Sequence, residues 1–397
     1  MDARQDDGHR EGTLRLDVLT RRETRAPAPV PTRMSRDLRP AQRAPLMVLG
    51  FLGLVTGVAA GLARLGYRMP DFAAQASAEH GTLMIGAFFG VVIAIERAVA
   101  IGRPWAYLAP LFGGAGGAAI IAGYVLPGAW LLLAGSVVLV AASLDVVRRQ
   151  RASFTITIAV GAACWAIGNA GVALGAAVHD VVGWWLAFLL LTIAGERLEL
   201  SRFVQPSPAA RHAFVAIVAL MLASIVGIAH PLGARAFGAT LVALALWLFR
   251  NDIARRTVRK LGLTRFIAIC LLAGYAWLAI GGATLVVAGL VPGSRSYDAI
   301  VHALALGFVF SMVFGHAPII LPAVLRVSIP HTRWFYVPLV LLHGSLALRV
   351  AGDASTRFEW IRVGGLLNAL ALAAFVVANA TIVVRARTAR TAQRRVG

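Results

Sequence analysis

Charge, cysteine and lysine are all scarce in this sequence. Only 14% of its 397 residues are charged, two are cysteines, and Lys260 is the single lysine. Hydrophobic residues make up 59% of the chain, which leaves too little polar surface for a soluble protein of this length. The composition therefore excludes a soluble enzyme. It predicts an all-α, polytopic membrane protein with the lipid bilayer as its main partner.

The two cysteines, Cys164 and Cys270, both lie in apolar runs. They form no CxxC pair, so neither a disulfide framework nor a cysteine metal site is predicted, and burial as small apolar side chains is the favoured interpretation. The chain also contains no CxxCH, so any haem would be held without covalent attachment. A cytochrome that exchanged electrons with this protein would be a separate molecule.

Basic residues outnumber acidic ones and give a formal net charge of +20. Such an excess can indicate nucleic-acid binding, but here the basic residues lie in the two tails and in alternate short loops. Lysine and arginine in that arrangement set the orientation of membrane helices. We therefore predict no nucleic-acid partner.

Twelve apolar runs approach or exceed the length of about 20 residues that crosses a bilayer. We predict spans at residues 44–66, 74–101, 104–125, 128–147, 153–176, 180–202, 211–229, 232–249, 264–291, 297–325, 334–351 and 360–384. With the amino terminus inside, the cytoplasmic loops and carboxyl tail hold 21 basic residues. The outer side holds seven, namely Arg64, Arg68, Arg235, Arg295, Arg349, Arg357 and Arg362. This bias predicts twelve helices in a bacterial inner membrane, with both termini cytoplasmic.

The segments outside this membrane domain (44–385) are polar and basic. Residues 1–43 contain Arg21, Arg22 and a proline-rich stretch and show no helical periodicity, so we predict a disordered cytoplasmic tail. Met34 is an alternative start of the chain. Residues 386–397 are predicted to form a second basic cytoplasmic tail.

A short motif recurs at an interval of one hundred residues. Ile93 to Arg97 reads IAIER, and Ile193 to Arg197 reads IAGER. The interval predicts that spans two, six and ten are equivalent members of three four-helix units. Glu96–Arg97 and Glu196–Arg197 lie at cytoplasmic helix ends, where we expect each acid and base to form an interfacial ion pair.

Two histidines, His80 and His302, lie at matching depths in spans two and ten, near the outer face. Two neutral imidazoles on facing helices can bind one haem within a bundle. Small neighbours would leave room for a flat macrocycle, namely Gly81, Gly86, Ala303, Ala305 and Gly307. The alternative, that each histidine only bonds a serine or a backbone carbonyl, remains equally open on spacing alone.

His316 and His343 are two further intramembrane histidines, in spans ten and eleven. His316 follows His302 by fourteen residues, which places both on nearly the same helix face at different depths. His316 and His343 are predicted to lie at similar distances from the cytoplasmic face, where they could share a second metal or haem. In the alternative interpretation His316 satisfies the backbone of a helix kinked at Pro318, and His343 is a packing residue.

The residues around His80 and His302 resemble a known family. His80 to Ile85 reads HGTLMI and is similar to the HGxLMI signature on the second helix of haem–copper oxidase catalytic subunits. The stretch from His302 to Pro322 resembles the tenth helix, most closely in the nitric-oxide-reductase and microaerobic-oxidase branches. This resemblance implies twelve helices in three units and a low-spin haem held by His80 and His302.

The sequence also departs from that pattern. Ile300 stands where the family has the histidine of its high-spin haem, span six lacks a midspan histidine, and no His-His pair occurs. The family's copper site therefore cannot be carried over, and copper is only a weak candidate cofactor. The remaining pattern resembles the NnrS family of twelve-helix haem proteins linked to nitric oxide and nitrosative stress.

We therefore predict a membrane-bound haem b protein that functions in electron transfer or nitric oxide handling, with a quinone or a cytochrome as redox partner. His80 and His302 are its predicted iron ligands, and His316 and His343 are further candidate metal ligands. No intact oxidase or reductase site is predicted, so an enzymatic activity stays open. A secondary transporter is the main alternative, because twelve spans and internal repeats are common in transporters. A sensor without a cofactor is another.

Overall fold

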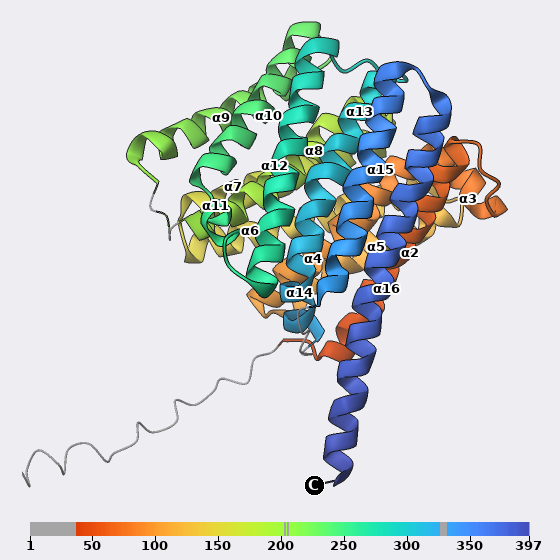
Figure 1. The fold of residues 1–397 in the computed structure, drawn as a ribbon, viewed down its shortest axis with the longest axis vertical. Helices are drawn as coiled ribbons and strands as arrows, with labels where there is room; N and C mark the ends of the chain where they lie inside the picture. The colour runs from red at the N-terminus through yellow and green to blue at the C-terminus, as the bar shows by residue number, and fades with distance from the viewer. Residues whose placement is uncertain (1–36, 202–203, 205, 326–331, 397) are drawn as a thin grey trace, which may run out of the picture. The chain divides into compact units, whose positions relative to one another are not determined.

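The computed structural model describes residues 37–201, 204, 206–325 and 332–396, and every regular element in these ranges is helical (Figure 1). Eleven described helices are long and apolar enough to cross a membrane. They are α2 (Pro40–Arg64), η2–α4 (Thr82–Phe89 and Gly90–Ile101), α6 (Val125–Arg149), α7 (Ser153–Ala173), α8 (Val178–Leu200), α9 (Pro208–Val226), α10 (Pro231–Asn251), α12 (Gly262–Ala288), α13–η5–α14 (Arg295–His302, Ala303–Phe310 and Ser311–Leu325), η6–α15 (Arg333–Phe335 and Tyr336–Ser355) and α16 (Phe358–Val396). Helices suit these runs because they satisfy every backbone polar group internally. The structure thus confirms an all-helical chain of the polytopic membrane type.

Four short helices and the shorter helix α5 complete the described part of the chain. The short ones are α3 (Asp71–Gln75), η1 (Ala76–Glu79), η3 (Pro104–Tyr107) and α11 (Ala254–Thr257). Helix α5 (Leu108–Ile121) follows η3 directly and packs against α2 and α6. At about 2.0 Å per residue for η3 and 1.5 Å for α5, the two together extend roughly 29 Å, close to the thickness of a bilayer core.

Helix α2 begins at Pro40, inside the segment predicted to be a disordered tail. Arg43 is 1% exposed and forms an ion pair with the Asp37 carboxylate, which also accepts a hydrogen bond from Tyr107 Oη at 2.8 Å. A tertiary partner on η3 therefore orders residues 37–43, which the polar local sequence could not indicate. Residues 1–36, including Met34, lie outside the described residues.

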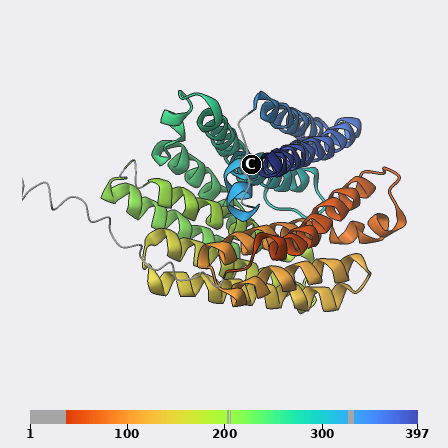
Figure 2. The ribbon, with the colours of Figure 1, turned by 90° about the horizontal axis from the view of Figure 1, so that it is seen from below.

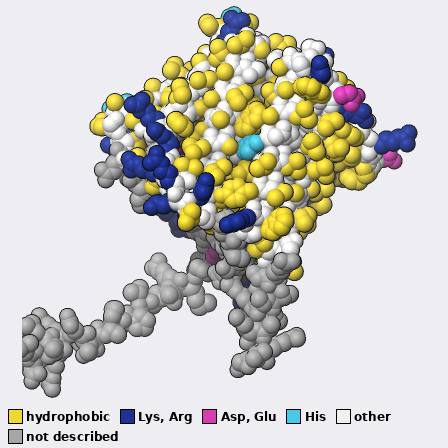
Figure 3. Space-filling view, viewed as in Figure 1, with side chains coloured by type: hydrophobic (Ala, Val, Ile, Leu, Met, Phe, Trp, Pro, Cys, Tyr) yellow, Lys and Arg dark blue, Asp and Glu magenta, His cyan; other side chains and the backbone are white. Residues whose placement is uncertain are grey.

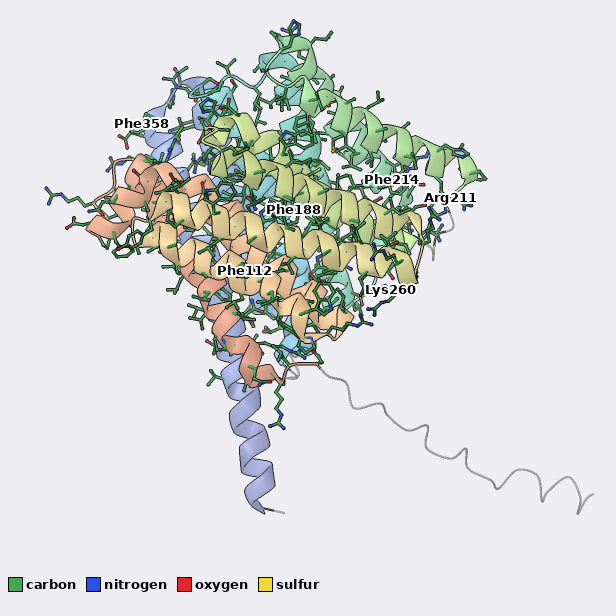
Figure 4. All side chains as sticks on the ribbon, turned by 180° about the vertical axis from the view of Figure 1, so that it is seen from behind. Phe112, Phe188, Arg211, Phe214, Lys260 and Phe358 are labelled. Carbon is green, nitrogen blue, oxygen red and sulfur yellow. The ribbon has the colours of Figure 1, made fainter. Side chains whose placement is uncertain are left out.

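The centre of the bundle is α8, whose membrane window is 78% buried. It packs against both η2 and η5, while α14 contacts α4, so the second, sixth and tenth predicted spans meet at the middle. Figure 2 shows the helices from below, with the carboxyl-terminal helices (blue) across from those coloured orange and yellow. Phe188, near the middle of α8, is fully buried (Figure 4). Cys164 and Cys270 are buried free thiols, as expected.

Polar and apolar side chains separate on the surface. Hydrophobic side chains cover most of the described face in Figure 3, while Lys and Arg gather toward one side. Figure 4 shows Arg211 and Lys260 on one side of the bundle and Phe358 on the opposite side. The beginning of α2 and the end of α16 lie at the same end of the bundle (Figure 1).

Candidate functional site

Two π-helical segments follow His80 and His302 and run side by side. Segment η2 begins two residues after His80, and η5 begins directly after His302. The rings of His80 and His302 have centroids 6.3 Å apart and planes inclined by 18°, and eight residues further on Phe88 and Phe310 stack at 5.8 Å and 11°. The two segments are therefore parallel and in register. π-Helical turns are rare and occur frequently at functional sites.

The His80 ring is held by α2. Its Nδ1 lies 2.7 Å from the carbonyl oxygen of Gly57, and because a carbonyl only accepts, Nδ1 carries the hydrogen. Gly61, one turn along α2, faces the same ring: a Cβ atom there would lie 2.8 Å from His80 Cε1. The ring thus occupies space that only a glycine on α2 leaves open.

The His302 ring is held by its own helix and by α15. Its Nδ1 lies 2.8 Å from the Asp298 carbonyl oxygen and 3.3 Å from Asp298 Oδ1. Arg349 binds the same carboxylate in a bidentate manner, at 2.8 and 2.9 Å. Arg349 was expected at the outer surface but is 8% exposed and serves as a buried partner of Asp298. Such an outer group orients a metal-binding imidazole.

Nδ1 therefore carries the hydrogen in both facing rings, which leaves the Nε2 lone pair free in each. No hydrogen-bond partner of either Nε2 occurs among the residues that the structure describes. A metal-binding histidine typically has this arrangement, with one nitrogen bonded to a carbonyl and the other open to the metal. Each ring bonds to a backbone carbonyl, as the packing interpretation also expects, and a role for the second nitrogen stays a prediction.

His316 contacts a different set of residues. Its Nε2 lies 2.7 Å from Arg197 Nη2 and its Nδ1 lies 2.6 Å from the Met312 carbonyl oxygen. A guanidinium has no acceptor, so Arg197 donates to Nε2 and Nδ1 donates to Met312. Both nitrogens of His316 are thus engaged by protein groups.

His343 is engaged in a similar way. The Trp277 indole N–H donates to its Nδ1 at 3.0 Å, and its Nε2 lies 3.3 Å from Ser311 Oγ. The two histidines bond to groups on different helices, His316 to Arg197 on α8 and His343 to Trp277 on α12. Among the described residues no cluster of three or more His, Cys, Asp or Glu side chains is placed to hold a metal ion. A second metal at these histidines stays a prediction.

The glycines expected to leave room for a macrocycle serve helix packing instead. A Cβ atom on Gly86 would lie 3.1 Å from Leu132, and one on Gly307 would lie 2.4 Å from Trp277. Gly81 similarly faces Val178 at 3.1 Å. Close helix contact, rather than an open slot, therefore accounts for these three residues.

An apolar cavity of about 350 Å³ lies between α2, η2–α4, α8, η5–α14 and α16. Its lining includes Leu54, which lies one turn of α2 away from Gly57. It also includes Phe88 and Phe310. The cavity thus begins about one helical turn from the facing histidines.

Polar residues of the lining lie about two helical turns beyond Phe88 and Phe310, at one end of the cavity. They include Glu96, Glu196, His316 and Asn379. The prediction of ion pairs within Glu96–Arg97 and Glu196–Arg197 is wrong, because neither carboxylate has an ion pair among the described residues. Instead, the recurring motif brings both carboxylates to one cavity. Local sequence could not show this, because the contact joins helices a hundred residues apart.

The pattern of the family described as "Domain of unknown function (DUF8744)" matches residues 43–384. No functionally curated protein matches the chain.

Proposed function

The chain belongs to the DUF8744 family, and we propose that this member is a haem b protein of the bacterial inner membrane in which His80 and His302 hold one iron. Its proposed role is electron transfer or nitric oxide handling, with a quinone or a cytochrome as redox partner. One observation carries the proposal: the two rings face each other with both Nδ1 atoms bonded to carbonyl oxygens and both Nε2 lone pairs free. The likeness to the NnrS and haem–copper oxidase patterns supports it.

The separation of the rings fits a shared metal. Imidazole nitrogens bind metal ions at about 2.0–2.1 Å. His80 and His302 would each supply one nitrogen to such an ion, and their ring centroids are 6.3 Å apart. Rings in van der Waals stacking would lie closer. The two histidines thus supply the kind of donor that a haem iron takes.

The charges around the histidine pair also fit a haem, whose two propionates are anionic. Arg64 and Arg349 lie close enough to interact electrostatically with His80. Arg349 in addition holds the Asp298 carboxylate beside His302. A haem bound by two imidazoles would supply one-electron exchange at this position. The chain's own residues would orient both rings and keep their acceptor nitrogens unprotonated.

We further propose twelve spans with both termini in the cytoplasm, grouped as three units whose second helices are equivalent. Segment η3–α5 has the length of a twelfth span, and an even number of spans agrees with the shared end of α2 and α16 (Figure 1). The central contacts of η2, α8 and η5 support the equivalence. The paired π segments on the second and tenth spans add to it.

Purified full-length protein is expected to contain one haem b per chain and to show a low-spin reduced-minus-oxidised spectrum. The pyridine haemochrome assay identifies the haem type, and iron analysis gives the ratio of iron to protein. Expression with added haem precursor avoids a false negative from poor supply. Protein that is monodisperse and free of haem under these conditions would contradict the proposal.

Gly61→Ala should weaken haem binding although residue 61 is no ligand. The new Cβ would lie 2.8 Å from His80 Cε1, so the ring or α2 must shift away from the iron position. We expect a clear loss of haem occupancy, measured as the ratio of Soret to protein absorbance, with the fold retained. Gly344→Ala is the matched control, because nothing lies within 4 Å of its new Cβ. Equal occupancy in both variants would show that α2 does not position His80.

A further inference from the structure

The polar end of the cavity presents hydrogen-bond acceptors without donors. The carboxylates of Glu96 and Glu196 line it and have no hydrogen-bond or ion-pair partner among the described residues. Asn379 is 5% exposed; its Nδ2 donates to the Phe375 carbonyl at 2.8 Å, which leaves Oδ1 unpaired. Buried polar groups normally have partners, so the unpaired Asn379 Oδ1, together with the two half-buried carboxyl groups that line the same space, indicates a ligand with donor groups.

Nearby cations do not satisfy these acceptors. Arg197 directs Nη2 to His316, and its buried Nε has no partner in the described part of the chain. Glu196 interacts electrostatically with Glu96, Arg97 and Arg197, but no ion pair with either arginine occurs among the described residues. A bound metal ion does not fit, because no metal-binding cluster occurs among the described residues. The missing groups are therefore neutral donors such as hydroxyls.

The rest of the cavity fits a flat aromatic body. Phe88, Phe89 and Phe310 line it and contact one another, with centroids 4.9 to 5.8 Å apart. Its volume of about 350 Å³ lies within the usual range for small-ligand sites, roughly 300–1,000 Å³. Phe51 on α2 and Ala380 on α16 line it and are partly or largely exposed. A ligand can thus enter between these helices from the lipid phase.

We propose that this cavity binds a lipid-soluble hydroquinone, with its ring among the phenylalanines and its hydroxyls donating to Glu96, Glu196 and Asn379. The unpaired acceptors favour a ligand with hydroxyl donors. The phenylalanines favour an aromatic ring, and the position within the membrane favours an apolar tail. In naming a ligand of the quinone class, the inference rests on the proposed function. Hydroquinone binding does not depend on haem.

The test is equilibrium dialysis of radiolabelled decylhydroquinone against the full-length protein in lipid nanodiscs, kept under nitrogen. We expect saturable binding, and at least tenfold weaker binding of the oxidised decylquinone, which has nearly the same size and no donors. Equal affinity for both compounds, or no saturable binding of either, would overturn the proposal. This comparison uses the wild-type protein, so it does not depend on the folding of a variant.

Variants locate the site. Glu196→Ala should weaken hydroquinone binding about tenfold, because it removes an acceptor that lines the cavity. Ala317→Phe should abolish binding by filling the cavity, which Ala317 lines. Asp145→Asn is the control, since Asp145 pairs with Arg149 away from the cavity. Wild-type affinity in both cavity variants would place the ligand elsewhere and overturn the assignment.

Dialysis with His80→Ala separates this inference from the haem proposal. The label reports binding without haem absorbance, and we expect wild-type affinity in that variant. Saturable, donor-dependent binding to wild-type protein that contains no haem would support the cavity assignment while contradicting the proposed function. A wild-type protein that contains haem but binds no hydroquinone would support the proposed function and overturn the cavity assignment.

Discussion

His80→Ala and His302→Ala should each abolish the low-spin haem spectrum. Each removes one of the two rings whose Nε2 atoms are free and whose Nδ1 atoms are bonded to carbonyl oxygens. An iron that loses one of two axial imidazoles becomes high-spin or is lost. The measurement is the reduced-minus-oxidised spectrum, with haem content by pyridine haemochrome. Adding imidazole should partly restore the low-spin bands, which a merely structural defect would not allow.

His316→Gln and His343→Gln are the matched controls. Both replace intramembrane histidines whose two nitrogens already bond to protein groups, and glutamine can keep part of that bonding. We expect both variants to retain the low-spin spectrum. If either control lost it while His80→Ala kept it, the assignment of the ligands would be wrong.

Gly90→Ala should destabilise the bundle strongly for so small a change. Gly90 directly follows η2, and its Cβ would lie 2.1 Å from Cζ2 of Trp165, a fully buried ring stacked on Phe188 at 5.1 Å. Overpacking of this kind costs about 1–3 kcal/mol, more than the roughly 1 kcal/mol that alanine gains over glycine in a helix. Thermal unfolding in detergent at a fixed scan rate should show a clearly lowered midpoint.

Two further variants make the Gly90 result specific. Gly344→Ala should leave the midpoint unchanged or raise it, because its Cβ would have open space. Combining Gly90→Ala with Trp165→Leu should cost less than the sum of the single changes, since the smaller side chain removes the clash. If the losses in midpoint of the two single variants simply added up in the double variant, contact with Trp165 would not be the reason that residue 90 must be glycine.

Several features of the site could be predicted from local sequence. The matching depths of His80 and His302 follow from residue counts along two apolar runs, because a helix advances by a constant rise. The repeated Ile-Ala-x-Glu-Arg motif indicated related helices, although not the shared cavity of Glu96 and Glu196. The π segments at Thr82 and Ala303 had no signal in composition, because they depend on neighbouring helices that hold the backbone.

The sequence by itself determined that this chain is a helical membrane protein, and it indicated where almost every span lies. Those features depend on the transfer of consecutive apolar residues into lipid, which is a local quantity. Only the tertiary structure decided which histidines keep a free lone pair. Arg197 binds His316, Trp277 binds His343, and Asp298 with Arg349 orients His302. These contacts join helices far apart in the chain, and a hydrogen bond forms only where packing brings its two atoms within about 3 Å.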